Sequence, residues 1–226
     1  MSDNLRCILR GAGVFFLMAF VSAAVGGLVF QQAVYGGDPS ESAIENSIIE
    51  QVQFGLLILC TVLVAAAAAR RRDGRAGYAL VASFFACMAI RECDNFFDKL
   101  LFHGAWFPFV LAVAAAAIVA AVLHWKQTHA GMAAIVRDTY FGLLSAGLSV
   151  ILVFSRILGH KSIWITIYRD ICGEEKAEAL SRAMKNLAEE GTELFGYTLL
   201  AFWAVALLAG SRECGRDSAR QQGRPG

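Results

Sequence analysis

The chain is poor in charge and in proline. Only 17% of its 226 residues are charged and three are proline, whereas about a quarter of residues are charged in ordinary soluble domains. No Ser-, Gly- or Pro-rich linker separates two halves, so the sequence predicts a single domain over residues 1–226. No basic stripe interleaved with aromatic residues is present, which argues against nucleic acid as a partner.

Motifs that would identify a site are also lacking. The six cysteines form no CxxC or CxxH pair, so they do not indicate a metal-binding motif. No Gly-x-Ser-x-Gly motif of a serine hydrolase is present. Cys93 and Cys172 fall on the side of the membrane that we predict below to be external, where an oxidising compartment would allow a disulfide. We favour two free thiols, because no second cysteine pair supports the disulfide.

Apolar residues are abundant and occur in long runs. Hydrophobic residues make up 57% of the chain, and the mean hydropathy is +0.54. About 20 apolar residues are needed for a helix to cross a bilayer, and runs of this length are too long for barrel strands. Because backbone groups cannot go unpaired in lipid, the runs should be helices. The sequence therefore predicts an all-α bundle of six transmembrane helices, at about 11–30, 49–69, 76–97, 105–125, 136–158 and 187–210.

Basic residues near the ends of these runs predict the orientation. One side carries Arg70, Arg71 and Arg72 together with Lys126 and Arg137, whereas the loops on the other side are rich in acids, such as 38–41. The basic side should be cytoplasmic. With six spans, both termini and the polar tail 211–226 should be cytoplasmic, and the location should be the plasma (inner) membrane.

Acidic residues recur near the external ends of the runs. They are Glu50, Glu92, Asp94, Asp98, Glu189, Glu190 and Glu193. A charged side chain costs about 2.5 kcal/mol or more at the centre of a membrane. At helical spacing these acids fall on polar stripes together with Arg91, Arg156 and His160, and a stripe on the fifth run begins at Ser149. Since lipid does not accept such stripes, we expect them to face one another in a shared polar pocket.

The first hypothesis is that this pocket binds a divalent cation and acts on a lipid or lipid-linked substrate as a hydrolase. Oxygen ligands favour magnesium, manganese or calcium over zinc. The Glu-xx-His motif of di-metal bundles is absent. In this hypothesis Arg91 and Arg156 hold an anionic group and Glu190 and His160 are catalytic. The metal ligands would be Glu50, Glu92, Asp94, Glu189 and Glu193.

Two alternatives stay open at this stage. In the first, protons or cations reach the acids from outside and travel with a solute, with Glu189, Glu190 and Glu193 as the relay. The stripes do not continue to the cytoplasmic ends, and no repeat of interrupted helices is present, which disfavours this alternative. In the second, the chain is a non-catalytic membrane subunit whose salt bridges only fix helix packing. The sequence does not determine the oligomeric state.

Overall fold

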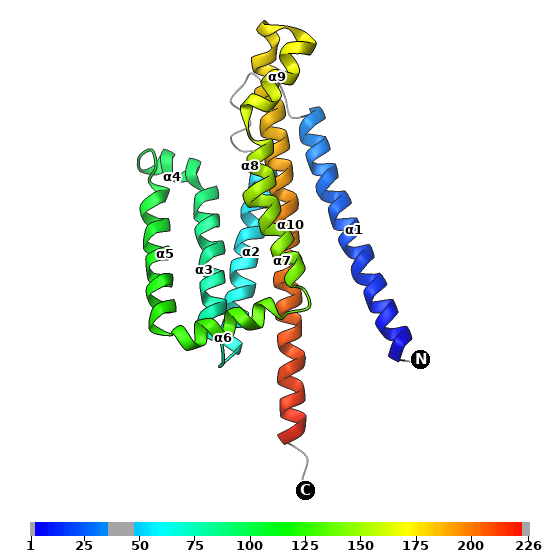
Figure 1. Cartoon of the computed structure of the whole chain (residues 1–226), viewed down its shortest axis with the longest axis vertical. Helices are drawn as coiled ribbons and strands as arrows, with labels where there is room; N and C mark the ends of the chain where they lie inside the picture. The colour runs from blue at the N-terminus through cyan, green and yellow to red at the C-terminus, as the bar shows by residue number, and fades with distance from the viewer. Residues whose placement is uncertain (1–2, 36–47, 223–226) are drawn as a thin grey trace. The chain divides into compact units, whose positions relative to one another are not determined.

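All regular structure in the described part of the chain is helical. The computed structural model describes residues 3–35 and 48–222, and no strand occurs in these ranges. The fold class is therefore all-α, as predicted. The helices, shown in Figure 1, are α1 (Asp3–Tyr35), α2 (Ile48–Arg70), α3 (Arg75–Glu92), α4 (Asp94–Leu100), α5 (Trp106–Leu123), α6 (Trp125–Val136), α7 (Phe141–Ser149), the π-helix η2 (Val150–Phe154), α8 (Ser155–Leu158), α9 (Lys161–Cys172) and α10 (Glu174–Gln222). The acidic segment 38–41 lies outside the described residues.

The chain divides into two compact units. The first comprises residues 1–49 and 149–198, and the second comprises residues 50–148 and 199–226. α10 contributes its first half to one unit and its second half to the other.

Five of the described helices are long and apolar enough to cross a membrane. The segments are Ala12–Gln31, Ile48–Arg70, Trp106–Leu123, Phe141–Leu158 and Lys176–Gly210. They correspond to all the predicted spans except the third. The predicted run 76–97 is interrupted at Cys93, where α3 ends and the short α4 begins. α3 itself carries Arg75, Arg91 and Glu92 within 18 residues, which lowers its apolar character.

In the second unit, α3 packs against both α5 and α6. α6 was not expected from the sequence, and it crosses the lower ends of α3 and α5 in Figure 1. The contact depends on glycine. A Cβ placed on Gly131 would lie 2.2 Å from the carbonyl oxygen of Gly74 and 2.9 Å from Cα of Gly77. Gly74 also has a φ of +79°, which L-residues rarely adopt. The backbones of α3 and α6 are thus in direct contact.

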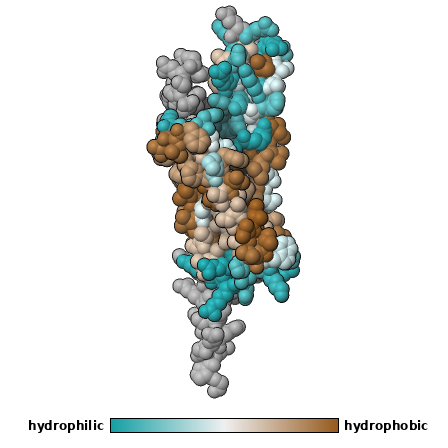
Figure 2. Space-filling view, turned by 90° about the vertical axis from the view of Figure 1, so that its left-hand side faces the viewer, coloured by the Kyte–Doolittle hydropathy of each residue, from teal (hydrophilic) through white to brown (hydrophobic). Residues whose placement is uncertain are grey.

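The surface of the second unit has an apolar band. Val62, Ile118 and Val119 are more than half exposed, which is expected for side chains that face lipid. In Figure 2, which is viewed from the side of α5, the hydrophobic surface of this unit lies above a hydrophilic lower end. The interior holds Phe85 and Trp203, whose rings meet edge to face at 6.2 Å. This distribution supports a membrane protein.

In the first unit, α9 and the start of α10 form a helical hairpin. Gly173, with a φ of +79°, makes the turn. Lys161 Nζ lies 2.8 Å from Glu178 Oε1, which links the first residue of α9 to the second turn of α10. Within the candidate span Lys176–Gly210, α10 approaches α1 at Gly191, where a Cβ would lie 3.1 Å from Cγ1 of Val29. The short helix α8 also lies beside α10, and the candidate site is found there.

Candidate functional site

A π-helix directly precedes α8 and affects the direction in which Arg156 projects. The turn η2 replaces the α-helical i→i+4 pattern with i→i+5 bonds just before α8. Each π turn contains about one residue more than an α turn, so the stripe predicted from Ser149 to Arg156 is shifted in phase. Ser155 becomes fully buried and Arg156 turns toward α10. Ser155 Oγ donates to the carbonyl oxygen of Ile151 at 2.5 Å.

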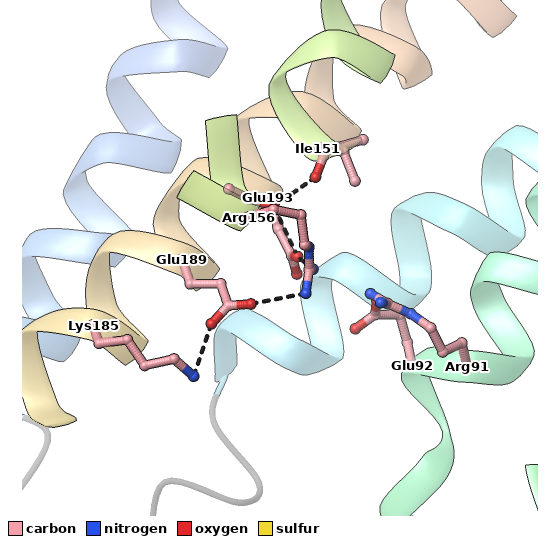
Figure 3. Close-up of polar contacts among 8 residues, drawn as sticks. Arg91, Glu92, Ile151, Arg156, Lys185, Glu189 and Glu193 are labelled. Atoms are coloured by element: carbon pink, nitrogen blue, oxygen red, sulfur yellow. Dashed lines mark hydrogen bonds and ion pairs between the residues drawn. The ribbon is translucent and has the colours of Figure 1, made fainter. Parts of the chain in front are cut away.

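Arg156 binds two carboxylates of α10. Its Nη1 lies 3.0 Å from Glu189 Oε1, and its Nη2 forms an ion pair with Glu193 Oε1. Glu189 and Glu193 are four residues apart, so both project from one face of α10. Ser155 Oγ also lies 3.1 Å from Glu193 Oε1. Figure 3 shows Arg156 between the two glutamates.

Lys185 completes this group. Its Nζ lies 2.9 Å from Glu189 Oε2, at i−4 on α10. We call Ser155, Arg156, Lys185, Glu189 and Glu193 the Arg156 cluster. Gly159, the residue directly after α8, packs against this cluster, since a Cβ placed on it would lie 2.6 Å from Cδ of Glu189. A glycine at this position gives the Glu189 side chain room beside the backbone.

The Arg156 cluster is neutral when its groups are ionised. Two cations, Arg156 and Lys185, face two anions, Glu189 and Glu193. The side chain of Glu193 is only 7% exposed, whereas that of Arg156 is 47% exposed. A buried carboxylate is tolerated when it is paired and hydrogen-bonded, and Glu193 has both Arg156 and Ser155. The cluster therefore has no uncompensated negative charge to offer a divalent ion.

The other predicted residues of this unit lie close in sequence but are not in the cluster. Glu190, a predicted catalytic residue, is half-buried on α10 and has its own interaction partner. His160 is exposed and precedes α9 with an extended backbone (φ −83°, ψ 111°). The helical stripe that was to align His160 with Arg156 ends one residue earlier, at Gly159, because α8 ends at Leu158.

The predicted residues of the second unit are Glu50, Arg91, Glu92 and Asp94. Glu92 Oε1 pairs with Arg91 Nη2 at 2.8 Å, as Figure 3 also shows. Glu50 lies half-buried in the first turn of α2, and Asp94 is the exposed first residue of α4. The structure brings together Arg156, Glu189 and Glu193 within one unit and Arg91 and Glu92 within the other. The meeting of all predicted acids in one pocket stays a prediction.

Asp98, the remaining acid, closes the connection between α4 and α5. Its Oδ1 accepts a hydrogen bond from the backbone N–H of Gly104 at 2.8 Å, and its Oδ2 lies 2.6 Å from Nδ1 of His103. Gly104 has a φ of +82°, which suits glycine. The hydrogen bond from Gly104, followed by the one to His103, lowers the pKa of Asp98 below its ordinary value. Asp98 thus has a local structural role.

The predicted metal centre is not supported. Among residues 3–35 and 48–222, no three His, Cys, Asp or Glu side chains gather in a group that would hold a metal ion. Cys93 is a free thiol, as favoured, whereas the side chain of Cys172 lies outside the described part of the chain.

Sequence reasoning missed Ser155 and Lys185 as members of the site. For Lys185 a signal existed, because it precedes Glu189 by four residues, and such pairs meet on a helix. For Ser155 no signal existed, because α-helical spacing does not hold across η2.

No protein-family model, no curated protein and no solved structure matches this chain.

Proposed function

We propose that the chain is a non-catalytic integral membrane protein in which the Arg156 cluster is a structural ion-pair network. The cluster joins α8, at the end of one candidate span, to α10. The observation that carries the proposal is that Arg156 binds both Glu189 and Glu193 and leaves the cluster neutral. A metal-dependent hydrolase would instead need carboxylates free to bind an ion.

We propose further that α3 crosses the membrane as a sixth span. It packs against α5, which is apolar enough to cross. Its charges are confined to its ends, since the residues from Ala76 to Ile90 are uncharged. These 15 residues cover about 22 Å, so Arg75 and Arg91 fall near opposite faces of a hydrocarbon core about 30 Å thick. This supports six spans with both termini on one side.

A double-mutant cycle tests the structural role. Arg156→Gln leaves Glu193 buried without its cation, and we expect it to lower the free energy of unfolding by about 2 kcal/mol. This is less than the 3–5 kcal/mol for fully buried pairs, because Arg156 is half-exposed. Adding Glu193→Gln to Arg156→Gln should recover part of the loss. The measurement is thermal unfolding in detergent micelles.

Arg169→Gln is the matched control for that cycle. Arg169 is 56% exposed and lies 3.8 Å from the exposed Glu174, so its removal should change stability by less than about 0.5 kcal/mol. Equal unfolding temperatures for wild type and Arg156→Gln would contradict a structural role of the cluster.

The second candidate function is a proton- or cation-coupled carrier. It is favoured by one observation, the π-helix directly before Arg156, because π turns frequently occur at functional sites. A half-exposed Arg156 beside the buried Glu193 also gives solvent a route to the carboxylate. Solute-driven pH change in proteoliposomes, lost in Glu193→Gln while the unfolding temperature is retained, would establish the carrier in place of the structural role.

Metal analysis separates the structural role and the carrier from the hydrolase hypothesis. If the cluster is neutral and structural, the purified protein should contain no stoichiometric divalent ion, and excess chelator should leave its unfolding temperature unchanged. A bound ion that disappears in Glu193→Gln would instead support a metal-dependent enzyme.

A further inference from the structure

The second unit contains a basic cavity at the end where α2 terminates. Its volume is about 670 Å³, and its polar wall includes Arg71, Arg72, Arg75 and Gln127. Its other wall is apolar and is formed by α3 and α5, with Leu80, Ala117 and Ala120. Among the described residues that line the cavity, none is acidic. An arginine-rich cavity of this kind attracts an anion.

The three arginines differ in whether their side chains contact other residues of the protein. Arg71 is held in place by Tyr78: its Nη1 donates to the phenol oxygen at 2.6 Å, and its guanidinium lies 4.5 Å from the ring centroid. Arg72 and Arg75 are exposed, and no ion pair with them forms in the described part of the chain. Guanidinium groups bind phosphate through two parallel hydrogen bonds. Arg72 and Arg75 are therefore available to a phosphate.

A narrow apolar groove continues from this cavity between α2 and α3. Its volume is about 310 Å³, and it shares Ala69, Arg75, Ala79 and Ser83 with the basic cavity. The rest of its lining is almost entirely alanine, including Ala65 on α2 and Ala86 on α3. From Ala79 to Ala86 the groove follows α3 for about 10 Å. Small side chains on both helices leave room for an alkyl chain.

We propose that the cavity and the groove together bind one anionic phospholipid, with its phosphate at Arg72 and Arg75 and an acyl chain in the alanine groove. Basic pockets between transmembrane helices bind anionic headgroups in this way. Arg75 lines both spaces, at the point where a headgroup would join its chain. A soluble phosphate compound would use the arginines but would leave the groove empty.

The test measures lipid bound to the full chain in mixed micelles by native mass spectrometry. The probes are phosphatidylglycerol, phosphatidylcholine, glycerol phosphate and inorganic phosphate. We expect phosphatidylglycerol to bind at least about tenfold more tightly than the other three. Arg72→Gln and Arg75→Gln should each weaken its binding about tenfold, which corresponds to a lost charged hydrogen bond.

Matched variants separate the site from general effects. Arg70→Gln removes a neighbouring exposed charge that lines neither space, and it should leave the affinity within about twofold. Ala65→Leu fills the groove at an exposed position and should weaken phosphatidylglycerol at least fivefold, whereas Ala115→Leu on the exposed surface of α5 should not. Circular dichroism confirms that each variant keeps its helices.

Three results would overturn the proposal. Equal losses in Arg70→Gln and Arg75→Gln would show attraction by general surface charge. Equal binding of phosphatidylcholine would show that the phosphate and arginines do not select the lipid. Equal affinities for glycerol phosphate and phosphatidylglycerol, with no effect of Ala65→Leu, would assign the cavity to a soluble phosphate compound.

Discussion

Arg156 satisfies two carboxylates at once because they lie one helical turn apart on α10. Its planar guanidinium presents several donors in a fixed geometry, which suits two acceptors at that spacing. A lysine at this position would carry the charge but could not present the same planar fork. The local chemistry of the Arg156 cluster therefore depends on the type of cation and on its position at the start of α8.

At Asp98 a single acid should make a loop sensitive to pH. Its pKa is lowered in the folded protein, so its stabilising effect is present above its ordinary pKa and is lost as the pH falls through the lowered value. We expect the Gly104 amide to lose protection from hydrogen exchange as the pH falls below about 4. Nuclear magnetic resonance in micelles measures this protection.

Asp98→Asn is the control for the loop. The amide oxygen still accepts from Gly104 but does not titrate, so protection should no longer depend on pH in this range. Constant protection in the wild-type chain down to pH 2 would contradict the role of Asp98.

At this scale the sequence predicted part of the site. Glu189 and Glu193 were expected to lie on polar stripes that face a stripe with Arg156. The partner side chains could not be derived where regular periodicity fails, as at Ser155. Charge compensation in the Arg156 cluster also depends on Lys185, which precedes the predicted last span at 187–210.

Among the helical elements, η2 is the one that departs most from ideal geometry. It contains the exposed Leu152 and directly precedes the buried Ser155. A π turn takes up about one residue more than an α turn, so the sequence spacing across η2 is shifted while the helices on its two sides keep their direction in space. We therefore expect the extra residue to be dispensable for the pairing of Arg156 with α10.

Deletion of Leu152 should convert η2 into a regular α turn. We expect the variant to unfold within a few degrees of wild type, because Arg156 still faces Glu189 and Glu193. Deletion of the exposed Ile118 in the regular helix α5 is the control, and it should be strongly destabilising because it rotates all later residues of α5 by about 100°. Thermal unfolding in micelles compares the two, and equal losses would refute this view of η2.

The α3–α6 contact makes another prediction at the level of elements. In Gly131→Ala the new methyl group would meet the backbone of Gly74, so the helices must separate. Overpacking of this kind typically costs about 1–3 kcal/mol. Gly142→Ala in α7 is the matched control, since no atom lies within 4 Å of a Cβ there. A Gly131→Ala chain as stable as the control would show that the contact is adaptable.

Helix boundaries were predictable where apolar runs are uninterrupted, as for α5. α6 was missed because its residues 125–136 mix Lys126, Gln127 and His129 with apolar residues and do not form a long apolar run. The break at Cys93 was missed because Phe96 and Phe97 continue the apolar pattern beyond it. Long apolar runs identify the helices that contact lipid, but they do not show where a helix breaks or changes direction.

For the whole molecule, α3 decides the topology. Five spans would place the termini on opposite sides of the membrane, whereas six place them on the same side. α10 is about 70 Å long, from 49 residues at 1.5 Å each, so parts of it extend beyond a hydrocarbon core of about 30 Å.

Reporter fusions test this topology. We expect reporters that are active only in the cytoplasm to function at both Met1 and Gly226. A reporter inserted at Phe102, in the connection between α4 and α5, should be inactive. Activity at only one terminus would show that α3 does not cross.

The distribution of charge on α3 has a consequence for biosynthesis. With Arg75, Arg91 and Glu92 in 18 residues, α3 partitions poorly from the translocon into lipid as an isolated segment. Packing against α5 becomes available only after residue 123 has been synthesised, and the glycine contact with α6 only after residue 131. If α3 crosses the membrane as proposed, its stable integration should be delayed until its later partners emerge from the ribosome.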